Sequence, residues 1–164
     1  MKTLQNKNIG KKDKGNINFD DLDDVDRPTL GRCVDVVLFR VLKFSMLNYL
    51  GFSKNSKIYS AGKSFGKYLK IRSIEEMIEF FKAYNIGILE IVDENPLKIR
   101  IYECIDCSGL PNIGKPVCFF EAGLIAGMLE NILGKSVYVT EVKCHATGHD
   151  YCEFKVKIVD EDTE

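Results

Sequence analysis

Four side chains of metal-binding type lie in the last third of the chain, namely Cys118, Glu141, Cys144 and Cys152. Three thiolates and one carboxylate would satisfy a four-coordinate Zn(II) with no open position, which is the arrangement of structural rather than catalytic zinc sites. Two other interpretations stay open, because free cysteine is a common core residue and two hairpin cysteines can also form a disulfide. The residue types therefore raise structural zinc as a hypothesis.

A helix is expected to present the first of these ligands. Residues 117–133 carry apolar side chains at steps of four, with Pro116 before them and Gly134 directly after them. Proline fits the first turn of a helix, and glycine commonly follows the last turn. Cys118 is therefore predicted to lie at the start of this helix.

A β-hairpin is expected to present the other three ligands. Residues 136–140 and 152–159 alternate apolar and polar side chains on either side of a glycine-containing turn. Closure of this hairpin would bring Cys144 and Cys152 within reach of a common point. Because Glu141 precedes Cys144 by three positions, the two side chains can face the same point only if the strand has a bulge or an early bend.

A second pair of thiols competes with this site. Cys104 and Cys107 form a C-x-x-C motif, which could be half of a zinc knuckle with Cys144 and Cys152 as the other half, or a redox-active dithiol. The glycine- and proline-containing segment 108–112 follows the motif, whereas redox dithiols of the thioredoxin type are followed by a helix. The sequence alone does not place this pair inside or outside the metal site.

Length, composition and charge restrict the class of protein. The chain has 164 residues, a hydrophobic fraction of 45% and a formal net charge of -1, so we expect one globular domain and no direct nucleic-acid partner. It contains neither an apolar run of about eighteen residues nor an apolar signal core, so we expect a cytoplasmic protein with no membrane span. In a reducing compartment, six cysteines favour metal binding over a disulfide framework.

The chain is expected to divide into a polar N-terminal arm or tail at 1–26, a domain at 27–159 and an acidic tail at 160–164. A long helix is predicted over 29–50, with apolar residues at steps of three and four that give it a wide face to bury. Cys33 falls in this stripe, far from the other five cysteines, and is expected in the core.

Gly62 and Gly66 lie four residues apart in the next predicted helix. Neither glycine has a side chain, so either another backbone or a ligand could approach closely there. Antiparallel hairpins with helices packed on one side make an α+β fold. The remaining predicted elements are helices over 55–71 and 74–84, the latter capped by Ser73 and Glu76, and strands over 87–92 and 98–104.

The strings GKPVCFFEAGLIAG, EVKC and C-x-A-x-G-x-x-x-C-x-F resemble the 4-vinyl reductase domain family. This family is a small-molecule-binding module that occurs alone in archaea and bacteria and fused in phenol-sensing transcription activators. The resemblance spans roughly residues 31–158. It implies an architecture like that of TRAPP vesicle-tethering subunits, dimerisation, for which helix 29–50 is the candidate surface, and a zinc ion held by Cys118, Glu141, Cys144 and Cys152.

The resemblance also implies an apolar pocket for a small hydrophobic or aromatic molecule. Two other functions stay open: an accessory protein or carrier in the reduction of a vinyl group on a tetrapyrrole, and a structural assembly subunit. A sensor of this kind would need a signalling or enzyme partner, which the sequence does not identify. The expected pocket residues are Gly62, Phe65, Gly66, Leu69, Phe119, Phe120 and Leu124.

The sequence offers few catalytic groups. It has no Ser/His/Asp arrangement supported by spacing, no phosphate-binding glycine loop and no flavin or nicotinamide fingerprint. His145 and His149 flank the hairpin turn and are expected to face solvent or to support the ligands. For Glu121 and Glu130, the acidic candidates on helix 117–133, a solvated helix face is an equally good explanation.

Overall fold

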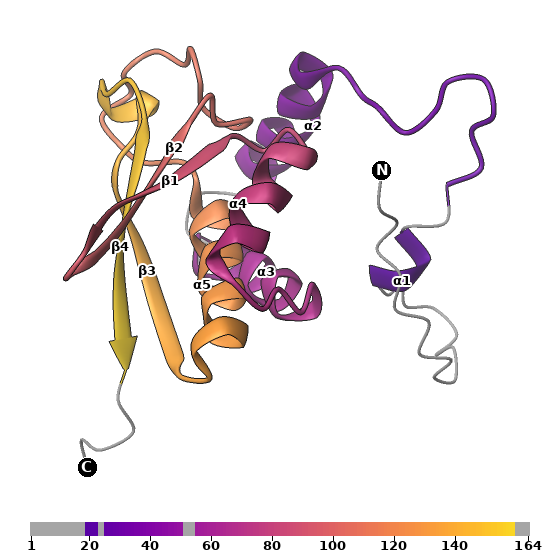
Figure 1. The fold of residues 1–164 in the computed structure, drawn as a ribbon. Helices are drawn as coiled ribbons and strands as arrows, with labels where there is room; N and C mark the ends of the chain where they lie inside the picture. Colours follow the sequence, from indigo (N-terminus) through magenta and orange to yellow (C-terminus); the bar gives the residue numbers. More distant parts are fainter. Residues whose placement is uncertain (1–18, 23–24, 51–54, 160–164) are drawn as a thin grey trace.

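The computed structural model describes residues 19–22, 25–50 and 55–159, so the predictions for residues 1–18 and 160–164 lie outside it. Its sheet has four strands, and the helices α2 to α5 pack on one side of it (Figure 1). This is the α+β fold that the sequence predicted. The elements are α1 (Phe19–Leu22), α2 (Val36–Leu50), α3 (Asn55–Tyr68), α4 (Ile74–Ala83), β1 (Ile88–Glu94), β2 (Leu97–Tyr102), α5 (Phe119–Leu133), β3 (Ser136–Lys143) and β4 (Cys152–Val159).

Two hairpins make up the sheet. The strand order is β1-β2-β4-β3, and every neighbouring pair is antiparallel. The pairing of β2 with β4 joins the hairpins and sets Ile101 opposite Cys152. Since β2 ends at Tyr102, this register brings Cys152 beside the segment that continues to Cys104.

Helix α5 forms the centre of the core. It lies between α3 and the sheet, and nine consecutive residues from Glu121 to Leu129 are buried. Cys118 is its N-cap, and Gly134 ends it in the left-handed conformation with φ of 65°, as predicted. Because the helix is covered on all sides, the position of Cys118 is fixed by packing from both layers.

Helices α3 and α5 touch through their backbones. A Cβ atom at Gly62 would lie 2.1 Å from the carbonyl oxygen of Phe120, and one at Gly66 would lie 2.3 Å from that of Leu124. Real Cβ atoms do not approach so closely, and the overpacking would strain the core. Of the two alternatives for these glycines, the structure shows the approach of another backbone, and α5 fills the space above them.

Helix α2 is shorter than predicted. It begins at Val36 because the carboxylate of Asp35 accepts hydrogen bonds from the backbone N–H groups of Val37 and Leu38, which caps the helix. Cys33 therefore precedes the helix and is exposed, so its prediction as a core residue was wrong. The other predicted elements lie within three residues of the observed bounds.

The N-cap of α4 is confirmed at Ser73, whose hydroxyl accepts a hydrogen bond from the N–H of Glu76 at 3.2 Å. The carboxylate of Glu76 accepts from the N–H of Arg72 at 2.9 Å, one residue before the N-cap. Among the helices that the structure describes, none has the length and apolarity needed to cross a membrane.

Candidate metal centre

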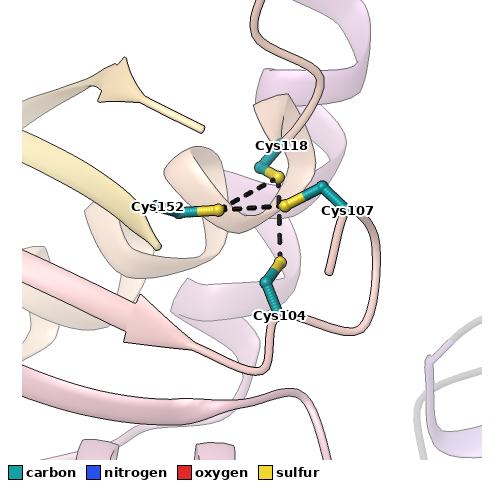
Figure 2. A group of neighbouring side chains, drawn as sticks. All are labelled: Cys104, Cys107, Cys118 and Cys152. Carbon is teal, nitrogen blue, oxygen red and sulfur yellow. Dashed lines mark hydrogen bonds between the residues drawn. The ribbon is translucent and has the colours of Figure 1, made fainter. Parts of the chain in front are cut away.

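Five of the six cysteines are buried, and they gather beside the N-terminus of α5. Figure 2 shows four of them with their sulfur atoms turned toward one another. Three parts of the fold contribute: the connection after β2 supplies Cys104 and Cys107, the N-cap of α5 supplies Cys118, and the β3–β4 hairpin supplies Cys144 and Cys152. The fold thus collects thiols that lie up to 48 positions apart in the sequence.

The distances between the sulfur atoms suit a tetrahedral metal site. The Sγ atom of Cys118 lies 3.7 Å from that of Cys104, 3.7 Å from that of Cys152 and 3.9 Å from that of Cys144. A tetrahedral ion with Zn–S bonds of about 2.3 Å has ligand edges of about 3.8 Å. The Sγ atoms of Cys107 and Cys152 are 3.1 Å apart, still far beyond the roughly 2.05 Å of a disulfide bond.

The donor atoms form two groups, and within each group all lie within 4.8 Å of one another. The first group contains the ligands predicted from the hairpin and the helix: Cys118, Glu141, Cys144 and Cys152. The second contains four thiols: Cys104, Cys107, Cys118 and Cys152. The C-x-x-C pair therefore joins the cluster, although with Cys118 and Cys152 rather than with the two hairpin cysteines. Either group could hold a metal ion.

Glu141 reaches the cluster because β3 bulges. The register of β3 against β4 shifts between Glu141 and Lys143, which confirms the predicted irregularity. One carboxylate oxygen accepts a hydrogen bond from the N–H of Cys118 at 2.9 Å. The other oxygen, Oε1, is buried with no hydrogen-bond partner among the described residues, and burial raises the pKa of this carboxyl to about 9. A cation beside Oε1 would remove this cost.

The hairpin turn holds Cys144 in a fixed conformation. The hydroxyl of Thr147 donates to the carbonyl oxygen of Cys144 at 2.9 Å and lies 3.0 Å from its N–H, which donates in return. Hydrogen bonds from Cys107 and Cys118 lower the pKa of the Cys144 thiol. The ring of His149 contacts the Thr147 hydroxyl at 3.1 Å, and His145 is half-buried, with neither histidine in a donor group.

A buried ion cluster adjoins the thiols. Lys43 of α2 pairs with Asp106 and, at 3.5 Å, with Glu121, and both carboxylates are almost fully buried. Although burial alone would lower the pKa of Lys43, the two carboxylates raise it. Burial also raises the pKa of Glu121. The expectation of a solvated face for Glu121 was wrong, because α2 covers the first turn of α5.

Glu130 also differs from that expectation. Its carboxylate pairs with Lys63 at 2.7 Å and with Lys67 at 2.6 Å, and only 9% of its side chain is exposed. Since both lysines belong to α3, this pairing joins α3 to the last turns of α5. The role of Glu130 is therefore an inter-helix contact.

Arg40 binds the same loop as Lys43. Its guanidinium donates to the backbone carbonyls of Ser108 at 2.9 Å and Cys104 at 3.2 Å, and also to that of Ile105. These contacts connect residues more than 60 positions apart. The sequence pattern did not reveal Arg40, Lys43 or Asp106, because each is unremarkable until the loop and α2 meet.

The residues expected to line a pocket fall into three environments. Gly62 and Gly66 lie against α5, and Leu124 is in the core. Leu69 and Phe119 are partly buried. Phe65 and Phe120 belong to an aromatic cluster on the helical side, in which the ring of Phe65 lies 5.2 to 6.5 Å from those of Phe19, Tyr68, Phe80 and Phe120.

Comparison with known sequences and structures places these features in context. Residues 97–158, which include every member of both donor groups, match the model of the 4-vinyl reductase domain. Protein MJ1642 of Methanocaldococcus jannaschii is 47% identical over 132 residues, which is 80% of this chain and 82% of that protein. Protein MJ0150 of the same organism is 39% identical over 140 residues and is covered to 80%.

Three solved structures share the fold. A vinyl-4-reductase family protein from M. jannaschii is 32% identical, with a TM-score of 0.63 over 80% of this chain and 85% of that one. The phenol-responsive sensory domain of the transcription activator PoxR, with phenol, has a TM-score of 0.60 at 14% identity, over 76% and 75% of the chains. A trafficking protein particle complex subunit 3 from Naegleria fowleri, covalently bound to palmitic acid, has a TM-score of 0.56 at 17% identity, over 76% and 93%.

Replacement of Lys43 tests the buried ion cluster. Lys43→Met keeps the apolar stem but leaves Asp106 and Glu121 without their cation, so we expect a loss of about 3–5 kcal/mol in the free energy of unfolding. Chemical denaturation at neutral pH measures this loss, with Lys57→Met on the exposed face of α3 as the control. A loss as small as the ~1 kcal/mol of a surface ion pair would contradict the assignment.

Proposed function

We propose that this chain, which belongs to the 4-vinyl reductase domain family, is a small-molecule-binding or sensory domain whose fold is stabilised by structural zinc. The observation that carries the metal part is the buried cluster of five thiols and one carboxylate. The ligand part is supported by family membership and by the PoxR domain of the same fold, which responds to phenol. The domain itself would span residues 27–159.

Cys118, Glu141, Cys144 and Cys152 would hold the zinc ion. Their donor atoms lie close enough for one tetrahedral ion, and the unpartnered oxygen of Glu141 would gain a cation. With four protein ligands the ion would have no open position and would supply no chemistry. It would instead join the start of α5 to the β3–β4 hairpin, and zinc of this kind contributes roughly 10 kcal/mol or more of folding free energy in small modules.

Metal content tests this assignment. We expect protein purified without added metal to carry at least one zinc ion per chain, and chelation to lower its melting temperature. Cys152→Ser removes a thiol common to both donor groups and should lose bound zinc and stability together. The matched control is Cys33→Ser, which changes an exposed cysteine outside the cluster. Metal-free native protein, or full zinc content in Cys152→Ser, would contradict the proposal.

The aromatic cluster around Phe65 is the proposed ligand-binding region. It lies where α3, α4 and α5 meet, and Phe19 of α1 packs on its outer side with its ring 5.2 Å from that of Phe65 and 5.1 Å from that of Tyr68. An apolar or aromatic ligand would be recognised by ring stacking and burial. The palmitic acid bound to the trafficking subunit supports the capacity of this fold for apolar molecules.

Removal of the Phe19 ring tests the location of this region. In Phe19→Ala the cluster loses a covering ring, so we expect affinity for the probe 1-anilinonaphthalene-8-sulfonate to rise at least threefold. Fluorescence titration measures it, with Leu22→Ala, an exposed residue of the same helix, as the control. A melting curve excludes unfolding as the source of the signal. Equal affinities in Phe19→Ala and native protein would place the ligand elsewhere.

A homodimer through α2 completes the proposal. The outer side of this helix exposes several large apolar residues, which single soluble domains seldom leave contiguous. A second copy of the chain, with the same helix, would cover them. The exposed residues are Val37, Leu38, Val41, Leu42 and Met46.

Sedimentation equilibrium tests the dimer. Val41→Asp would place an unpaired charge in the interface, so we expect the mass to fall from that of two chains to that of one. Ser45→Asp, on the same helix at an exposed polar position, serves as the control for the added charge. Monomeric native protein, or a dimer that survives Val41→Asp, would exclude α2 as the contact.

A further inference from the structure

One metal ion does not use all the donors of the cluster. Six ligand atoms converge, five thiols and the carboxylate of Glu141, and each belongs to a side chain at most 8% exposed. A single tetrahedral ion binds four of them. Cys104 and Cys107 would then remain as unligated thiols with no exposed surface, directly against a bound cation's ligands.

The two donor groups overlap in a specific way. They share Cys118 and Cys152, whose sulfur atoms are 3.7 Å apart, and they differ in their other two members. Two tetrahedra that share one edge have this pattern, with two bridging ligands and two terminal ligands on each ion. The shared sulfurs come from α5 and β4, so the common edge is formed by two of the most rigidly packed elements of the fold.

We propose that the cluster binds two divalent metal ions bridged by the thiolates of Cys118 and Cys152. One ion takes Glu141 and Cys144 as terminal ligands, and the inference rests on the proposed function for this first site. The second ion takes Cys104 and Cys107. With metal–sulfur bonds of about 2.3 Å, ions on either side of the shared edge would be on the order of 3 Å apart.

The charges favour the second ion. One divalent cation with four anionic ligands has a net charge of minus two, and two cations with six anionic ligands have the same net charge. The second ion therefore replaces the protons of the Cys104 and Cys107 thiols without adding charge to the buried site. Positive groups lie on the same side, because Arg40 donates to the carbonyl of Cys104 and Lys43 pairs with Asp106 inside the C-x-x-C loop.

Titration of the metal-free, reduced full-length chain with Co(II) tests the proposal. Thiolate-to-cobalt absorption should increase up to two equivalents per chain. The paramagnetic resonance signal of high-spin Co(II) should grow up to one equivalent and then fall, because ions bridged by thiolates couple magnetically. Circular dichroism before and after the titration reports whether each variant is folded.

Three variants locate the two ions. In Cys104→Ser/Cys107→Ser the absorption should saturate at one equivalent with an undiminished resonance signal. Glu141→Gln/Cys144→Ser should behave in the same way through the other donor group. Cys33→Ser should retain two equivalents and the fall in signal, because its exposed side chain lies outside the cluster.

The outcomes separate this proposal from the one on which it rests. Native protein that saturates at one equivalent would overturn the two-ion centre and leave the single structural site in place. Two equivalents without loss of the resonance signal, or two equivalents in Cys104→Ser/Cys107→Ser, would place the second ion away from the shared edge and also overturn it. Native protein that binds no cobalt at cluster thiols would overturn both.

Discussion

The pairing of β2 with β4 is the constraint on which the rest of the structure depends. It sets Ile101 opposite Cys152 and so joins two hairpins that are separated in the sequence by α5. The same register delivers the chain after β2, with Cys104 and Cys107, to the place where the β3–β4 hairpin closes. Five thiols in one buried site follow from this contact, and so many thiols cannot ionise together without a cation.

Helices α5 and α2 hold the site from opposite directions. Backbone contact at Gly62 and Gly66 seats α5 closely on α3, and this fixes its N-cap, Cys118. Helix α2 contacts the C-x-x-C loop through Arg40 and Lys43 while its outer side remains apolar and exposed. The proposed metal ions and the proposed dimer surface are thus connected through one helix, so disorder of the loop would reach the interface.

The sequence predicted the fold well because its patterns are local. Period-four and period-two repeats, Gly134 and the Ser73 cap are readable within a few residues, and the bulge after Glu141 follows from ligand spacing. Cys33 was misplaced because the cap at Asp35, not the apolar stripe, decides where α2 begins. Glu121, Lys43 and the membership of Cys104 and Cys107 depend on contacts between distant segments, which no local pattern reports.

The central claim is that metal ions, and not packing alone, hold these thiols together. X-ray absorption at the zinc edge of protein purified in the absence of added metal tests it most directly. The account predicts a first shell dominated by sulfur at about 2.3 Å, with a minor oxygen contribution from Glu141. A shell of oxygen and nitrogen ligands, as for an ion bound loosely at the surface, or the absence of any bound zinc would contradict it.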